Sequence, residues 1–152
     1  MKKAVSSVVG AILTLALCFQ CIAAEPFSDL EGLDEKEKIT SLWERGYVKG
    51  VEDGKFAPGE FITAAEGIQL IVKAMGLNID TIRFIKAPEA TDYFAKADNG
   101  AWYADALIIA ANNSMELPAE LDPGARWTRE EFTFYLTEVM EASAGLPKLK
   151  IM

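Results

Sequence analysis

The chain has 152 residues, of which 51% are hydrophobic and 25% charged, with two cysteines and no histidine. Its 23 acidic residues outnumber its 15 basic ones and give a net charge of −8. This balance argues against nucleic acid as a partner, because phosphate binding needs a cationic surface.

Residues 1–24 are typical of a secretory signal. Lys2 and Lys3 precede an apolar run over residues 11–17, and the segment ends in small residues at Ala23 and Ala24. The run is too short and too early for a good membrane-spanning helix. No later stretch approaches the roughly 20 apolar residues that such a helix needs, so we expect no membrane span.

Both cysteines, Cys18 and Cys21, fall in this segment, so the processed chain would form no disulfide. Lipidation at one of them is the alternative to ordinary cleavage. Leu17 and Gln20 disfavour it, because lipoprotein sites usually have a small residue before the cysteine. Cleavage after residue 24 would leave 128 residues, enough for one domain or two small packed units.

The first helix is predicted from about Asp34 to Arg45. Ile39, Leu42 and Trp43 have the spacing of one buried helical face. Gly46 then follows where a left-handed C-terminal cap is expected.

A tight turn is predicted over Glu52-Asp53-Gly54-Lys55-Phe56, since an Asp-Gly pair supplies the positive φ that such a turn needs. The spacing of its acids does not match a calcium loop. The next helix should start at Thr63, which forms a capping box with Glu66. Its expected buried stripe is Leu70, Ile71, Ala74 and Met75.

The phrase Pro58–Glu66 recurs 65 residues later as Pro123–Glu131, each copy ending in Thr-x-x-Glu before an apolar helical pattern. This recurrence predicts a helical module used twice. In the second copy Thr128 and Glu131 form the capping box, and Asn113 takes the left-handed position of Gly46. Gly67 aligns with the aromatic Phe132, which makes the first copy the weaker one and costs about 1 kcal/mol of helix propensity.

The second unit aligns Ala106, Ile109 and Ala110 with the buried face of the first helix. The buried stripe of its last helix is expected to be Phe132, Tyr135, Leu136, Val139 and Met140. We therefore predict a mostly α fold of two tandem helix-turn-helix units with short extended segments, packed as one body. The expected segments are signal peptide 1–24, unit one 25–77, ordered linker 78–91, unit two 92–142 and tail 143–152.

The linker 78–91 alternates apolar residues, among them Ile79, Ile82, Phe84 and Ile85. It is too apolar for a solvated tether. We expect a short strand or extended segment packed against both units.

The residues of both units resemble an S-layer homology domain. Phe27-Ser28-Asp29-Leu30, the turn Gly50–Pro58 and Ile62–Glu66 carry the resemblance in the first copy. The second copy is similar through Ala101–Leu107, Leu121-Asp122-Pro123 and Trp127–Glu131. The resemblance covers nearly all of the chain after residue 24.

This resemblance implies non-covalent attachment to the bacterial cell envelope, with secondary cell-wall polysaccharide as the ligand, often through an acidic sugar. Arg129 matches the arginine that contacts this anion in the family, whereas the first copy has Ala64 at the same place. Arg129 would lie in the first turn of a helix, where a guanidinium and free backbone amides together favour a carboxylate. The alternative is an ion pair with a nearby side chain such as Glu130.

Three further residues are candidates for the glycan site. Trp127 could stack on a sugar ring or staple against the helix. Thr128, like Thr63, Glu66 and Glu131, is more simply explained as a structural cap. Trp102, beside Tyr103, could be half exposed and line a groove, or could pack in the core, where we also place Trp43.

Catalysis is not expected. With no histidine, and no cysteine after residue 24, the chain lacks the commonest general base, the thiolate nucleophile and the usual zinc ligands. Its prominent acids are already explained by caps and turns. We expect no cofactor and no metal.

The sequence thus favours a secreted protein of the cell wall or cell surface that binds an acidic polysaccharide. The alternative is a structural or protein-interaction module that assembles with another envelope protein, as an oligomer, and binds no glycan itself.

Overall fold

The computed structural model describes residues 25–52, 54–113 and 115–145. Within them the regular structure is helical: α1 (Lys36–Glu44), α2 (Ala64–Ala74), the short 3₁₀ helix η1 (Ala90–Asp92), α3 (Ala104–Ala111) and α4 (Arg129–Ser143). This part of the chain contains no strand, only two isolated bridges, Glu52 with Lys55 and Thr63 with Arg126. The predicted signal segment 1–24, Asp53 and residues 146–152 of the predicted tail lie outside the described residues.

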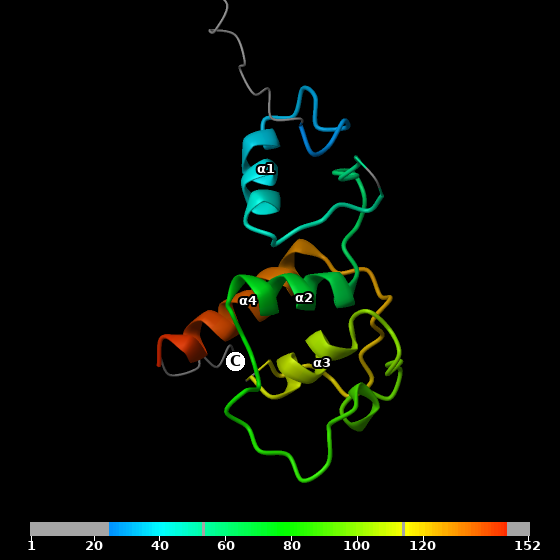
Figure 1. Cartoon of the computed structure of the whole chain (residues 1–152), viewed down its shortest axis with the longest axis vertical. Coiled ribbons are helices and arrows are strands. Elements are labelled where there is room, and N and C mark those ends of the chain that lie inside the picture. Colours follow the sequence, from blue (N-terminus) through cyan, green and yellow to red (C-terminus); the bar gives the residue numbers. More distant parts are fainter. Residues whose placement is uncertain (1–24, 53, 114, 146–152) are drawn as a thin grey trace, which may run out of the picture.

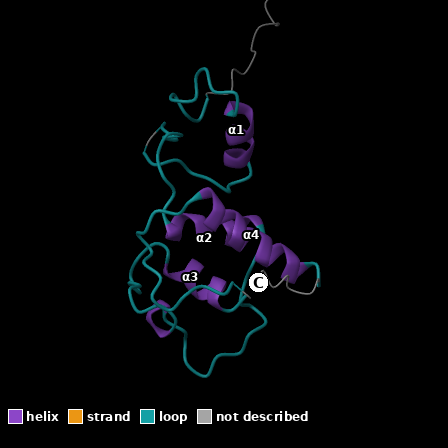
Figure 2. Cartoon of the chain, turned by 180° about the vertical axis from the view of Figure 1, so that it is seen from behind, coloured by secondary structure: helices purple, strands orange, loops and turns teal. Residues whose placement is uncertain are grey.

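The main core lies among α2, α3 and α4. Ile68 and Ile71 of α2, Leu107 of α3 and Val139 of α4 are almost completely buried in it. Among the helices, α2 packs chiefly against α3, and both views of the chain show α1 standing apart from this group (Figures 1 and 2). The mostly α prediction is confirmed, but the first helix does not pack on the second as a unit of its own.

The two copies of the repeated phrase lie side by side and are hydrogen-bonded to each other. The Ala64 amide donates to the carbonyl of Ala125 at 2.8 Å, and the Ala65 amide donates to the carbonyl of Pro123 at 3.0 Å. In return the Trp127 amide donates to the carbonyl of Ile62 at 2.9 Å. The first amides of a helix have no partner within the helix, so the second copy supplies the acceptors that α2 needs.

Gly67 on α2 faces the indole of Trp127. A Cβ at Gly67 would lie 2.6 Å from Cε3 and 2.9 Å from Cζ3 of that ring. The ring also stacks on Tyr135 at a centroid distance of 5.0 Å. The interpretation of Gly67 as a lost aromatic anchor is therefore wrong, because this position has no side chain in order to admit the aromatic ring of the other copy.

The buried face of α2 also differs from the prediction. It consists of Ala64, Ala65, Gly67, Ile68, Ile71 and Val72. Of the predicted stripe, Ile71 is buried whereas Ala74 is exposed. The face is rotated because Trp127 and the second phrase cover α2 from one side while α3 covers it from another.

The N-terminal part forms a small satellite cluster around Phe27. Phe27 and Leu30 are buried, and the Phe27 ring contacts Phe56 and Trp43 at centroid distances of 5.4 and 6.3 Å. No residue of α1 is itself buried, and Leu42 and Trp43 are 38% and 41% exposed. The predicted buried face of this helix is therefore wrong, because no second helix covers it.

Several local predictions are confirmed and others are not. Gly46 and Gly54 both have a positive φ, as the cap and the turn require.

Asn113 does not adopt the left-handed conformation; its side-chain amide donates instead to the carbonyls of Ile109 and Asn78. Within the predicted linker, Ile85 is fully exposed, whereas Ile79 packs against the main core. Met140, expected in the buried stripe of α4, is 51% exposed, since α4 extends beyond its contact with the core.

Asp29 ties the start of the chain to the turn before α2. Its carboxylate accepts from the amides of Phe56 at 2.9 Å and Ala57 at 2.7 Å. These hydrogen bonds, that of Phe56 first, hold the pKa of Asp29 below its ordinary value of 3.8. Ala57 has a φ of 56°, which is unfavourable for a residue with a Cβ, so the carboxylate stabilises a strained turn.

We expect Gly67→Ala to destabilise the protein by about 1–3 kcal/mol, because overpacking against the Trp127 ring outweighs the gain in helix propensity of about 1 kcal/mol. Denaturant unfolding measures the difference. Gly59→Ala is the matched control, since a Cβ there meets no atom within 4 Å. A stabilised Gly67→Ala variant would restore the interpretation of Gly67 as a simple propensity defect.

We expect Asp29→Asn to lower the free energy of unfolding at pH 7, since an amide oxygen accepts more weakly than a carboxylate. The pKa of Asp29 is lower in the native state than in the unfolded state. The stabilisation by its carboxylate is therefore complete above the unfolded pKa, about 4, and is lost as the pH falls through the native pKa. Unfolding midpoints of variant and wild type should therefore converge below about pH 4.

The control for that comparison is Asp34→Asn, because Asp34 is exposed and its side chain has no hydrogen bond within the described residues. A gap between Asp29→Asn and wild type that stays constant down to pH 3 would contradict the assignment.

Candidate functional site

The start of α4 is built by the capping box that the sequence predicted. The amide of Glu131 donates to the Thr128 hydroxyl at 3.1 Å, and the Glu131 carboxylate accepts from the Thr128 amide at 2.7 Å and from its hydroxyl at 2.9 Å. The bond from the Thr128 amide, with that from its hydroxyl, lowers the pKa of Glu131 from its ordinary value of 4.5. The same box forms between Thr63 and Glu66 at the start of α2. The structural role of these four residues is confirmed.

The two helix starts differ in what occupies their free amides. At α2 the amides of Ala64 and Ala65 donate to carbonyls of the second phrase, and both residues are buried. At α4 the equivalent amides belong to Arg129 and Glu130, which are exposed. Within the described part of the chain these two amides have no acceptor. The start of α4 is therefore open to an external anion, whereas the start of α2 is closed.

Arg129 is the first residue of α4, and its side chain is exposed. Among the described residues no hydrogen bond, ion pair or ring contact involves its guanidinium. The alternative of an ion pair with Glu130 is thus not formed. A cation here opposes the helix dipole, so the position does not stabilise the fold unless an anion joins it.

Trp127 cannot contribute an open ring to this site. It is 6% exposed, and its ring lies between Gly67 and Tyr135. Of the two interpretations of Trp127, packing against the helix is the one that the structure supports. The proposed stacking on a sugar is wrong, because neither face of the indole is free.

Trp102 is 60% exposed, just before α3, and contacts Tyr103 edge-on at a centroid distance of 5.5 Å. Within the described residues no hydrogen bond, ion pair or ring contact links it to Arg129 or Trp127. Arg129 and the cap at Thr128 share a helix start, whereas Trp102 belongs to the surface before another helix.

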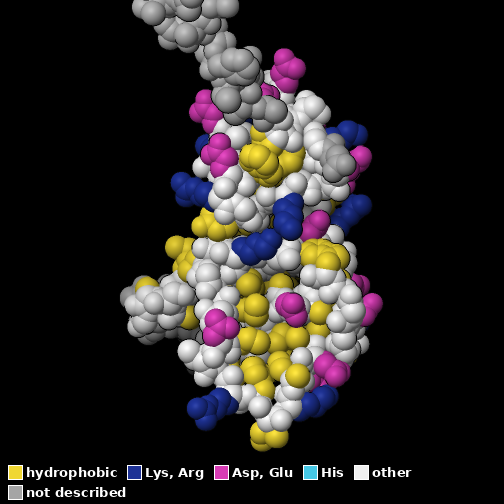
Figure 3. Space-filling view, in the orientation of Figure 1, with side chains coloured by type: hydrophobic (Ala, Val, Ile, Leu, Met, Phe, Trp, Pro, Cys, Tyr) yellow, Lys and Arg dark blue, Asp and Glu magenta, His cyan; other side chains and the backbone are white. Residues whose placement is uncertain are grey.

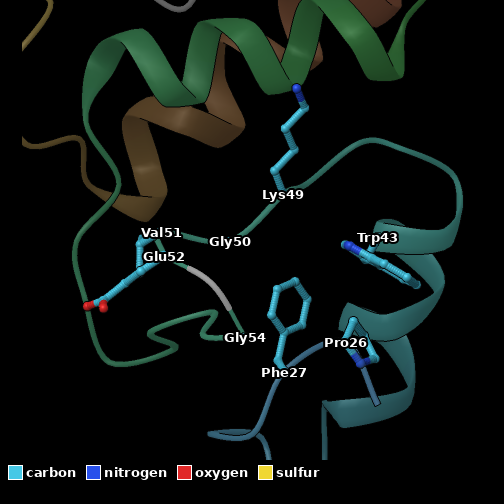
Figure 4. A pocket seen from close by; sticks show the side chains of 8 residues that line it. All are labelled: Pro26, Phe27, Trp43, Lys49, Gly50, Val51, Glu52 and Gly54. Atoms are coloured by element: carbon cyan, nitrogen blue, oxygen red, sulfur yellow. The ribbon is translucent and has the colours of Figure 1, made fainter. Parts of the chain in front are cut away.

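Sequence reasoning missed two surface features. Arg126 lies over the ring of Phe61 at 4.7 Å, which joins the two phrases by a cation–π contact. Trp43, which we placed in the core, lies instead between two open cavities of about 330 and 530 Å³ (Figure 4 shows the first). The polar residues Thr40 and Ser41 on α1 were the sequence feature that could have indicated an uncovered helix.

The chain matches no protein-family model, no curated protein and no solved structure. A functional assignment is therefore supported by the geometry of the described residues together with the motifs in the sequence. In residues 25–145, leaving aside positions 53 and 114, no helix has the length and apolar character to cross a bilayer.

We expect Arg129→Ala to leave the free energy of unfolding unchanged within about 0.5 kcal/mol, or to raise it slightly, because it removes a cation from a helix start. Thr128→Ala, one residue earlier, should cost about 1 kcal/mol through loss of the cap. Thermal or denaturant unfolding of the two variants side by side measures both. A destabilisation by Arg129→Ala as large as that by Thr128→Ala would show that the guanidinium has a structural partner.

Proposed function

We propose that this chain is a secreted, envelope-associated protein of two S-layer-homology-like units that binds an acidic cell-wall polysaccharide at the start of α4. The observation that carries the proposal is the contrast between the two helix starts. Among the described helices, only α4 starts at exposed residues whose first amides have no acceptor and also carries there a guanidinium that has no partner in this part of the chain. A carboxylate on a sugar would satisfy both donors at once.

The two units are not equal in this proposal. The first copy of the phrase has Ala64 where the second has Arg129, and the backbone at Ala64 is buried and already hydrogen-bonded. The equivalent site of unit one is therefore blocked by unit two. One acidic group per chain at this type of site is the expected stoichiometry.

The charge distribution is compatible with an anionic ligand despite the acidic composition. Figure 3 shows Lys and Arg side chains gathered between α1 and α2, where the acidic side chains are fewer. Basic side chains thus gather locally although the net charge of the chain is negative.

A second candidate function is assembly with another envelope protein. It is favoured by the exposed apolar side chains Val51 and Phe61, which are 57% and 67% exposed, and by the absence of any buried residue on α1. A partner that covered them would bury apolar area without an acidic glycan.

Retention on purified cell-wall sacculi tests the leading proposal. Wild type should be retained, and Arg129→Ala should lose about tenfold or more in affinity, the magnitude expected for a charge-assisted pair. Glu130→Gln is the matched control, since it removes a neighbouring charge and keeps the guanidinium, so its retention should be equal or stronger. Chemical removal of acidic substituents from the sacculi should act like Arg129→Ala.

Retention of Arg129→Ala equal to that of wild type would remove Arg129 from the site. Absence of retention for every variant, together with a stable hetero-oligomer in size-exclusion chromatography, would support the assembly function instead.

A further inference from the structure

α1 and α3 are equivalent helices of the two repeats, and the structure gives them different neighbours. An offset of 67 positions aligns α1 with α3 and also aligns Phe27 with Phe94, which are 3% and 2% exposed. The two units therefore begin alike, with a buried phenylalanine ahead of the helix. They differ in what lies on the helix: α3 packs against α2, and no helix takes that place on α1.

The residues of the two helices match this difference. The residues of α3 that are buried in the main core are Ala104, Ala106, Leu107, Ile108 and Ala110. Their counterparts on α1 are Glu37, Ile39, Thr40, Ser41 and Trp43, so three of the five positions are polar on α1. Polar side chains at three of these positions match a helix face that no other described helix covers.

A groove runs along the polar side of α1. A cavity of about 530 Å³ lies along α1, lined by Glu37, Thr40, Ser41 and Glu44, with Trp43 and Pro26 beside them. The cavity is open to solvent, so a ligand would lie against its lining and not be enclosed by it. The indole of Trp43 is 41% exposed and is the large aromatic surface of this groove.

Trp43 also borders a second cavity. Together with Pro26 it also lines the cavity of about 330 Å³ formed with Phe27 and residues 49–52 and 54. In Figure 4 its ring extends from α1 toward Phe27, while Lys49 points away from it toward α2.

We propose that this groove, defined by Thr40, Ser41, Trp43 and the flanking glutamates, is a sugar-binding site of unit one. The CH face of a pyranose packs on an indole, while its hydroxyls need donors and acceptors of the kind that Thr40, Ser41 and the carboxylates supply. An apolar helix would bury those polar groups without partners, so the groove suits a sugar better than a second helix.

The charges around the groove select the kind of sugar. Glu25, Glu37 and Glu44 line it, and its one lysine, Lys36, is already paired with Glu25. A carboxylated sugar would meet uncompensated negative charge here, whereas an ammonium group would be attracted. The ligand is therefore a neutral or amino-bearing hexose, most favourably a hexosamine, and not the acidic sugar that Arg129 is proposed to bind.

This inference rests on the proposed function only in taking a glycan as the ligand, since the groove shares no residue with the start of α4. It would give one chain two sugar contacts of opposite charge preference. Two weak contacts on one polymer add in avidity, provided that the polymer spans both.

Fluorine NMR of the chain labelled with 5-fluorotryptophan tests the groove directly, because the three tryptophans give separate resonances that Trp→Phe variants assign. Titration with a glucosamine tetrasaccharide, or with its N-acetyl form, should shift the Trp43 resonance at millimolar concentration. The Trp102 resonance is the internal control for an exposed tryptophan and should stay in place. A galacturonic acid tetrasaccharide should not move Trp43.

The double variant Thr40→Leu, Ser41→Ile gives α1 the residues of α3 and fills the groove while Trp43 remains. It should weaken the glucosamine tetrasaccharide by about tenfold or more. Thr137→Leu on the exposed side of α4 is the matched control and should bind like wild type.

An unmoved Trp43 resonance in the wild type with both amino sugars would overturn the proposal, whatever the variants do. An equal shift with the galacturonic acid tetrasaccharide would overturn the charge preference and with it the assignment. Sacculus retention that depends on Arg129 would survive either result, so failure of the groove and failure of the α4 site are distinguishable.

Discussion

The pairing of the two repeated phrases through their backbones is the interaction on which the rest of the structure depends. Carbonyls of Pro123 and Ala125 accept the amides that begin α2, and the amide of Trp127 donates back to Ile62. The same pairing carries Trp127 to Gly67 on α2, where the absence of a Cβ leaves room for the ring. Because the phrases are far apart in sequence, their pairing closes a long loop and brings α2 onto α3 and α4.

This pairing also makes the two repeats chemically unequal. The amides that begin α2 already donate to carbonyls of the second phrase, and Ala64 is buried. These amides are therefore not available to a ligand. The start of α4 faces outward, and its amides and guanidinium keep their capacity for an anion. The asymmetry of the proposed acidic-sugar site therefore follows from the packing of the repeats as well as from the exchange of arginine for alanine.

The N-terminal part of the described chain is less covered than the part around α3. No residue of α1 is buried, and α1 carries Glu37, Thr40 and Ser41 where α3 carries Ala104, Leu107 and Ile108. The N-terminal part is held by a small aromatic cluster around Phe27 and by the Asp29 carboxylate on the turn at Phe56 and Ala57. A short polar helix on a small cluster leaves surface grooves, which is where the second sugar site is proposed.

The sequence by itself determined the local features of this protein. The capping boxes of Thr63 and Thr128, the positive φ of Gly46 and Gly54 and the helical character of the chain all depend on interactions within a few residues, which a local pattern contains. Only the tertiary structure decided which faces are covered. It buried Trp127 and exposed Trp43, because burial depends on which distant segment arrives at a helix. It also left Arg129 open while enclosing Ala64, since the acceptors that close a helix start come from the other copy, 65 residues away in the sequence.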